Sequence, residues 1–310
     1  MTQLHALEDV TEALRGRLVI IGNFDGIHLG HQALINQAQS LAKEQGLDVL
    51  LLTFEPHPRK LLRPEDPPFR ITPAPLKMAR LKACGVADVL TLPFDWEFAS
   101  QSATDFIRNL LQEGLDAVHV VVGEDFRFGQ LRRGTPEMID AAGISVTVVA
   151  PTGMTTGGKK ISSSDVRAHL RRGEISAANE LLGWDWEISG IVQEGDKRGR
   201  ELGYPTANMT LGDSLHPAYG IYACYVQIEQ EEVWYPSAAN IGIRPMFQVD
   251  EGLVEAHVLG GFDRDIYGKA LRVRPIERLR GEAKFDSLEA LIAQMEKDCL
   301  KAKEILSYAD

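Results

Sequence analysis

An apolar run that leads into a glycine-rich turn with two histidines is the feature that most constrains the fold. The run Leu18–Ile21 is followed by the segment Gly22-Asn23-Phe24-Asp25-Gly26-Ile27-His28-Leu29-Gly30-His31. This order predicts a strand, a turn and a helix that runs from about His28 to Lys43 and stops at Gly46. A strand and helix joined in this way favour an α/β fold.

The same turn has the chemistry of an anion site. A helix that begins here directs unpaired N–H groups and the positive end of its dipole at the turn, which favours phosphate. His28 and His31 are three residues apart, so both rings lie on one face of the first helical turn. The pattern fits a nucleoside triphosphate, whereas a GxxH fragment alone is more often a turn with a hydrogen-bonded histidine.

The rhythm of the sequence changes once along the chain. Up to about residue 180, β-rich runs alternate with helical patterns, which predicts a parallel sheet covered by helices. After Gly183, alternating strands separated by turns predict an antiparallel barrel or sandwich. A final helix with a capping box from Asp286 to Glu289 closes this part. We expect two domains, residues 1–183 and 184–310.

Composition narrows the classes of function. The chain has 310 residues, of which 44% are hydrophobic, so it can bury a large core. The net charge of −11 argues against a nucleic-acid partner. No apolar stretch is long enough for a membrane span and no secretion signal is evident, so we expect no membrane partner and a cytoplasmic location. The three cysteines are widely spaced on apolar faces, which favours core packing over metal binding or disulfides.

A second segment could bind phosphate in the first domain. Ser162, Ser163 and Ser164 start a predicted helix and Arg167 lies on its first turns. Hydroxyls, amides and a guanidinium suit phosphate oxygens, but serines also cap ordinary surface helices. Together with the HxGH pattern of His28-Leu29-Gly30-His31, this segment resembles the signature pair of the nucleotidyltransferase superfamily, with Ser164 where an SSTxIR-type motif has threonine. In that superfamily an anionic group attacks the α-phosphate of ATP and pyrophosphate leaves.

Two further segments, 53–58 and 122–134, resemble the bacterial FMN adenylyltransferase branch of this superfamily. The resemblance implies a Rossmann-like nucleotidyltransferase fold, a flavin-side pocket at His57 and Asp125, and catalytic roles for His28 and His31. The phosphate of FMN is already ionised, so its attack needs alignment and charge neutralisation rather than a general base. The residues expected at ATP are Gly22, Asn23, Phe24, Asp25, Gly26, His28, Gly30, His31, Ser162, Ser163, Ser164 and Arg167.

The second domain carries a cationic glycine loop before a proline. This loop is either a phosphate lid or a solvated hairpin connection. Thr206 and Asn208 follow it two residues apart, so in an extended segment their side chains share one face and could bind Mg²⁺ together with ATP phosphates. The residues expected at the second ATP are Gly195, Lys197, Arg198, Gly199, Gly203 and Pro205.

The stretch from Pro205 to Asn208 resembles the PTAN motif of riboflavin kinases, and the likeness continues to about residue 282. The resemblance implies that Glu255 accepts the proton of the riboflavin 5′-hydroxyl. From strand alternation alone, Glu255 could equally be a solvent-facing carboxylate. Met246 and the Trp184-Asp185-Trp186 junction depart from the pattern of the family.

Both resemblances together imply a bifunctional riboflavin kinase and FAD synthetase. Its small antiparallel β-barrel domain with a C-terminal helix would convert riboflavin to FMN, and its first domain would convert FMN to FAD. ATP would be the co-substrate of both reactions, with Mg²⁺ as cofactor. Two alternatives are an adenylyltransferase whose barrel only binds flavin, and a flavin-sensing regulatory protein. The oligomeric state is not readable from the sequence.

Overall fold

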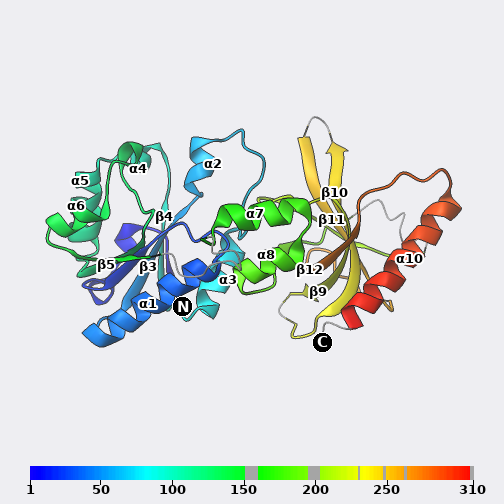
Figure 1. Ribbon diagram of the computed structural model, residues 1–310, viewed down its shortest axis with the longest axis horizontal. Coiled ribbons are helices and arrows are strands. Elements are labelled where there is room, and N and C mark those ends of the chain that lie inside the picture. Colours follow the sequence, from blue (N-terminus) through cyan, green and yellow to red (C-terminus); the bar gives the residue numbers. More distant parts are fainter. Residues whose placement is uncertain (151–159, 195–202, 230, 247–248, 262–263, 308–310) are drawn as a thin grey trace. The chain divides into compact units, whose positions relative to one another are not determined.

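The chain folds into two compact units, each with its own sheet (Figure 1). The computed structural model describes residues 1–150, 160–194, 203–229, 231–246, 249–261 and 264–307. The first unit comprises residues 1–66 and 72–162, and the second comprises residues 67–71 and 163–310. The two units are described one after the other.

A six-stranded sheet forms the centre of the first unit. Its strand order is β1-β4-β3-β2-β5-β6, and all neighbouring strands are parallel. The order reverses at β2, so the carboxyl end of β2 lies at the topological switch point, where α/β sheets bind ligands. The strands are β1 Thr2–Leu4, β2 Leu18–Ile21, β3 Val49–Glu55, β4 Asp88–Pro93, β5 His119–Gly123 and β6 Ser145–Val149.

Helices cover both faces of this sheet, because its strands are apolar on both sides. Val19 and Ile21 pack in one core, whereas Leu18 and Ile20 pack in the other. Helix α1 ends at Gly46, which has φ 67° and therefore takes the left-handed conformation that suits glycine. The helical segments are η1 Leu7–Asp9, η2 Glu12–Leu14, α1 Leu29–Gln45, α2 Pro58–Leu62, α3 Ala74–Ala83, α4 Trp96–Ala99, α5 Ala103–Asp105, η3 Phe106–Gly114, η4 Gln130–Arg132 and α6 Pro136–Ala141.

The second unit is a nearly closed antiparallel barrel of six strands. The strand order is β7-β12-β9-β10-β11-β8, and a bridge between Gln193 and Asn208 brings the two end strands together. Closure of this kind removes exposed strand edges. The elements are α7 Ser163–Arg172, α8 Ile175–Leu182, β7 Ile188–Ile191, β8 Ala207–Thr210, β9 Gly220–Ile228, β10 Tyr235–Met246, β11 Val249–Val258, β12 Ala270–Arg280 and α10 Leu288–Ser307.

The parallel sheet and the barrel with its terminal helix confirm the predicted fold class. The contacts group α7 and α8 with the barrel, although we expected them in the first domain. Trp186 is fully buried in the second unit, and its indole N–H donates to the carbonyl of Ile71 at 3.0 Å. The tryptophan junction thus has a packing role, and the boundary at residue 183 stays a prediction.

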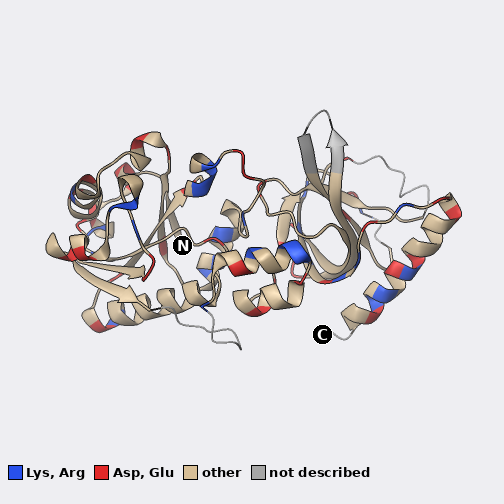
Figure 2. Ribbon diagram, turned by 45° about the horizontal axis from the view of Figure 1, so that its top comes forward, with Lys and Arg blue, Asp and Glu red and all other residues tan. Residues whose placement is uncertain are grey.

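Helix α10 packs against the barrel through apolar side chains and is also held there by an ion pair. Ala302 and Leu306 pack in a buried cluster with Ala223 of β9 and Ala238 of β10. Basic and acidic residues are distributed along the length of this helix (Figure 2). The hydroxyl of Ser287 accepts from the amide of Ala290, so Ser287 rather than the predicted Asp286 caps this helix.

The ion pair joins Arg280 at the end of β12 to Asp298 of α10. The guanidinium makes three contacts with the carboxylate, between 2.7 and 3.1 Å, and Gln294 donates to the same carboxylate at 2.9 Å. Asp298 is buried, with 7% of its surface exposed. Removing one partner of such a pair leaves the other charge without compensation.

We predict that Asp298→Ala lowers the free energy of unfolding by about 3 kcal/mol, because it leaves the charge of Arg280 without its partner. Urea unfolding followed by circular dichroism measures the effect. Glu304→Ala, at an exposed position of the same helix, is the matched control and should change the value by less than about 0.5 kcal/mol. Equal stability of the two variants would show that the ion pair contributes nothing.

Candidate active sites

The turn after β2 positions both histidines of the first unit. His28 is the N-cap of α1, and its Nδ1 accepts from the amide of His31 at 3.3 Å. Nδ1 is therefore unprotonated and the neutral ring carries its proton on Nε2. The two rings stack, with centroids 3.8 Å apart and an interplanar angle of 17°. The structure thus brings the two predicted phosphate ligands together.

Close packing around the turn makes a side chain at two of its glycines crowded. A Cβ atom at Gly30 would lie 3.1 Å from the His28 ring, and one at Gly22 would lie 3.1 Å from the Phe24 ring. The turn itself is left-handed at Phe24, Gly26 and Ile27, with φ of 50°, 93° and 40°. Packing therefore favours glycine at positions 22 and 30, and backbone conformation favours it at position 26.

Asp25 and Gly26 face the protein interior rather than open space. Asp25 is 2% exposed, and its Oδ1 accepts from the amide of Thr72 at 2.9 Å and from the Thr72 hydroxyl at 3.2 Å. The amide of Gly26 donates to the same hydroxyl at 2.8 Å. These two residues shape the turn, and their direct contact with ATP stays a prediction.

The two predicted flavin-side residues follow β3 and β5, the strands on either side of β2. His57 comes after β3 and caps α2, with its Nδ1 accepting from the amide of Arg59 at 3.1 Å. Asp125 lies in the loop after β5, where its exposed carboxylate pairs with Lys160. Both residues lie beyond the carboxyl ends of strands, as expected for a ligand site.

The second phosphate motif is divided between the units. Ser162 ends the first unit, whereas Ser163, Ser164 and Arg167 belong to α7 in the second. Arg167 is 9% exposed, and its Nε donates to the carbonyl of Phe69 at 2.9 Å. Its guanidinium also lies over the Phe69 ring, 5.5 Å from the centroid.

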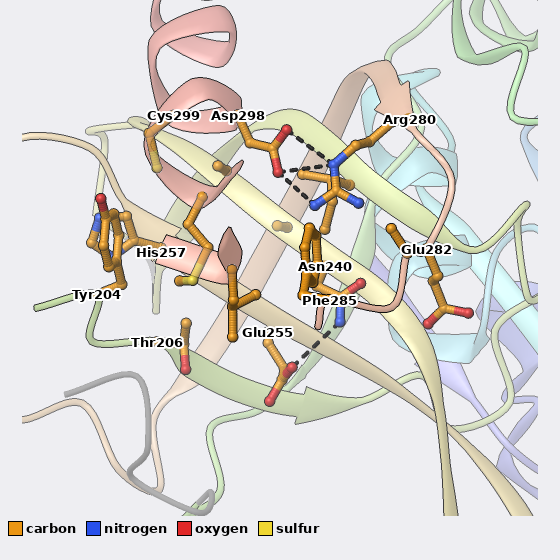
Figure 3. Close-up of a pocket in the computed structure, with 16 residues that line it drawn as sticks. Tyr204, Thr206, Asn240, Glu255, His257, Arg280, Glu282, Phe285, Asp298 and Cys299 are labelled. Atoms are coloured by element: carbon orange, nitrogen blue, oxygen red, sulfur yellow. Dashed lines mark hydrogen bonds and ion pairs between the residues drawn. The ribbon is translucent and has the colours of Figure 1, made fainter. Parts of the chain in front are cut away.

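The barrel of the second unit contains a cavity of about 450 Å³ (Figure 3). One part of its wall is apolar and comes largely from α10 and the segment before it, including Leu291, Met295 and Phe285. Another part is polar and comes from β10, β11 and the segment before β8, including Glu255 and Thr206. The cavity therefore suits a ligand with a flat apolar body and a polar chain.

Glu255 occupies the middle of a polar row across three strands. In the register of the sheet it is opposite Asn208 of β8 on one side and Asn240 of β10 on the other. The Nδ2 of Asn240 donates to Glu255 Oε2 at 3.4 Å (Figure 3). Glu255 is half-buried and lines the cavity, so it is not an ordinary solvent-facing strand residue.

The side-chain oxygen of Asn208 is buried and could accept a hydrogen bond. The residue is 7% exposed, and its Nδ2 donates to the carbonyl and hydroxyl oxygens of Thr206 at 3.2 and 3.3 Å. Within the described residues, its Oδ1 has no hydrogen-bond partner. A buried amide oxygen that accepts no hydrogen bond destabilises the folded protein, unless a ligand or ion binds to that oxygen.

Several cavity residues were not found by sequence reasoning. His257 Nδ1 contacts the carbonyl of Pro205 at 2.9 Å, and its ring lies 5.3 Å from that of Tyr204. Cys299 also lines the cavity, and burial raises the pKa of its thiol to about 11. Asp298 could have been noticed as an acid within the apolar stripe of α10.

Two residues predicted to bind the kinase ATP, Gly203 and Pro205, do not line the cavity. Pro205 supplies the carbonyl that His257 contacts, and Gly203 is exposed with φ 85°. The remaining members of the predicted phosphate loop lie outside the described residues; they are Gly195, Lys197, Arg198 and Gly199. All three cysteines are free thiols, and burial raises the pKa of each, as expected for packed side chains.

Comparison with known families divides the chain in the same order as the two sheets. Residues 10–165 match the family model described as FAD synthetase, and residues 182–306 match the one described as riboflavin kinase. A nucleotidyltransferase unit followed by a kinase barrel is thus the class of protein defined by the fold and the sites.

Relatives match nearly the whole chain. A bifunctional riboflavin kinase/FMN adenylyltransferase of Escherichia coli (strain K12) is 36% identical over 98% of this chain and 97% of that protein. One of Bacillus subtilis (strain 168) is 37% identical over 91% and 90%. A crystal structure described as a macrolide-efflux protein from Streptococcus pneumoniae has a TM-score of 0.84 and 30% identity, covering 96% of this chain and 97% of the other.

The chain belongs to the bifunctional riboflavin kinase/FMN adenylyltransferase family. Its carboxyl-terminal unit is a riboflavin kinase and its amino-terminal unit is an FMN adenylyltransferase, which confirms the predicted pair of activities. Riboflavin, FMN, FAD and ATP are the substrates and products. Among the helices built from described residues, none is long and apolar enough to cross a bilayer.

Proposed function

We propose that Glu255 is the general base of the kinase reaction. A ribityl hydroxyl is a weak nucleophile, and a carboxylate within reach of its proton raises its reactivity as the γ-phosphate is transferred. Support comes from the position of Glu255, which lines the cavity and is held by Asn240. The row of Asn208, Glu255 and Asn240 across the sheet is the single observation on which this proposal depends most.

The cavity is the proposed riboflavin site. The isoalloxazine ring would pack against the apolar wall of α10 and Phe285, and the ribityl chain would extend toward Glu255. Arg280 and Asp298 fasten α10 at this wall, so they support the shape of the cavity. Burial of a flat ring between apolar side chains supplies most of the binding energy, and the polar wall sets the orientation.

The residues at the PTAN motif fit Mg²⁺, which prefers oxygen ligands. The unused Oδ1 of Asn208 and the hydroxyl of Thr206 are suitable donors. Among the described residues, no group of three or more His, Cys, Asp or Glu could hold a metal ion, so the phosphates of ATP would supply the other ligands. When bound, Mg²⁺ would neutralise charge on the transferring phosphoryl group.

In the first unit, we propose that His28 and His31 bind the triphosphate of the second ATP. The Nε2–H of His28 and the first-turn amides of α1 provide donors where charge develops on the phosphates. The nucleophile is the phosphate of FMN, which is already ionised. Alignment and charge neutralisation are therefore sufficient, in agreement with a turn that presents donors rather than a carboxylate base.

The other assignments in the first reaction rest on the family resemblance. Ser162 to Ser164 and Arg167 are proposed ligands of the same triphosphate, and His57 and Asp125 are proposed flavin-side residues. The position of His57 and Asp125 beyond β3 and β5 supports their role. A cytoplasmic location is also kept as a proposal, since both reactions consume ATP.

We predict that Glu255→Gln lowers the kcat for FMN formation by about 10² to 10⁴-fold, because the amide cannot accept the proton. Conversion of supplied FMN to FAD by the same variant should be unchanged. Chromatography of both reactions measures these rates. Glu277→Gln, the same change at an exposed position of β12, is the matched control. A kinase rate near that of the unchanged protein would exclude Glu255 as the base.

We predict that Asn208→Ala raises the Mg²⁺ concentration needed for half-maximal kinase activity by about tenfold or more, because one oxygen ligand is lost. The measurement is the rate of FMN formation across a Mg²⁺ titration at fixed ATP. The adenylylation of FMN, followed in the same solutions, should keep its Mg²⁺ dependence. An unaltered titration curve for the kinase would remove Asn208 from the metal site.

We predict that His31→Ala lowers the rate of FAD formation from FMN by about 10² to 10³-fold, the effect of deleting one donor to a developing charge. Phosphorylation of riboflavin by the same variant should continue at its ordinary rate. Pyrophosphate release and FMN formation are measured separately. If both activities fell together, or neither fell, the two-site assignment would be contradicted.

A further inference from the structure

The turn that carries the two histidines has a conformation that its own sequence disfavours. Phe24 and Ile27 both have φ in the left-handed region, at 50° and 40°. Such angles are uncommon for non-glycine residues, and for a β-branched residue such as isoleucine they are true outliers. Neighbouring groups must therefore hold the turn in place, as is typical of strained backbone at functional sites.

Thr72 provides the hydrogen bonds that hold the middle of the turn. Its hydroxyl accepts from the amide of Gly26 at 2.8 Å and donates to Asp25 Oδ1 at 3.2 Å, while its amide donates to the same oxygen at 2.9 Å. Thr72 has no exposed surface, and Asp25 has 2%. Only a hydroxyl can accept from one neighbour and donate to the other at this position.

The segment that follows Thr72 is itself fixed to the sheet. Thr72 and Pro73 precede α3, and Lys77 of that helix is fully buried. Its ammonium lies 2.6 Å from Glu55 Oε1 and 3.2 Å from the hydroxyl of Thr53 at the end of β3. That hydroxyl in turn donates to the carbonyl of Asn23 at 3.3 Å. The turn is thus held on one side by β3 and on the other by Thr72.

We propose that Thr72 is a positioning residue for adenylyl transfer. Its hydroxyl fixes Asp25 and Gly26, and thereby the path of the chain into His28 and the first turn of α1. The hydroxyl bonds of Thr72 to Gly26 and Asp25 act on the turn, so its effect on the ATP phosphates would pass through the turn. The inference rests on the proposed binding of the ATP phosphates by His28 and His31.

The test compares Thr72→Val with Thr72→Ser in the full-length protein. Valine keeps the shape and the amide but removes the hydroxyl, whereas serine keeps the hydroxyl and removes a methyl group. We expect Thr72→Val to raise the KM for ATP in FAD formation by about tenfold, the loss of one buried hydrogen-bonding group. Thr72→Ser should restore the KM to within about twofold, and the KM for FMN should change in neither variant.

Riboflavin phosphorylation by the same chain reports on folding of the second unit, and thermal unfolding reports on the first. An unchanged KM for ATP in Thr72→Val would overturn the proposal. Equal defects in the valine and serine variants would also overturn it, because the methyl group and not the hydroxyl would then matter. If His31→Ala formed FAD at the ordinary rate, the proposed binding of ATP phosphates at the turn would be contradicted, whatever the result for Thr72.

Discussion

The hydrogen bonds between Thr72 and the turn at Asp25 and Gly26 hold a strained backbone at the end of a buried strand. The adenylyltransferase unit depends on them, since the turn sets the start of α1 and the stacked rings of His28 and His31. β2 lies at the switch point of the sheet, and the strands around it are apolar on both faces. Close packing of those strands makes the sheet rigid, and the polar groups that follow the carboxyl ends of the strands are held in place by it.

In the kinase unit, strand register positions the polar side chains of the site. Pairing of β8, β11 and β10 places Asn208, Glu255 and Asn240 in one row, and closure of the barrel keeps that row fixed. A shift of one residue in β11 would turn Glu255 to the other face of the sheet. Helix α10 then completes the cavity with apolar side chains, and its ion pair with Arg280 keeps it against the barrel.

Sequence reasoning predicted the fold class because hydrophobic periodicity is a local signal, and it located both histidines through their spacing. Resemblance assigned Glu255 to the kinase site, since alternation in β11 alone allowed a solvent-facing carboxylate. Glu255 and Thr206 line the same cavity, and their roles stay predictions. Sequence reasoning did not find Thr72, Lys77 or Asp298, whose roles arise from contacts between segments distant in sequence. Contacts group α7 and α8 with the barrel, and helix patterns in the sequence do not reveal which core a helix joins, so the domain boundary at residue 183 stays a prediction.

The central claim is that two different phosphoryl-group chemistries occur on one chain. The most direct test is chromatography of the purified protein with riboflavin, ATP and Mg²⁺ over time, beside a reaction started from FMN. The account predicts that FMN appears first and FAD follows, with pyrophosphate released in the second step. Formation of FAD only from added FMN would contradict a catalytic barrel, and formation of FMN without FAD would contradict a catalytic first unit.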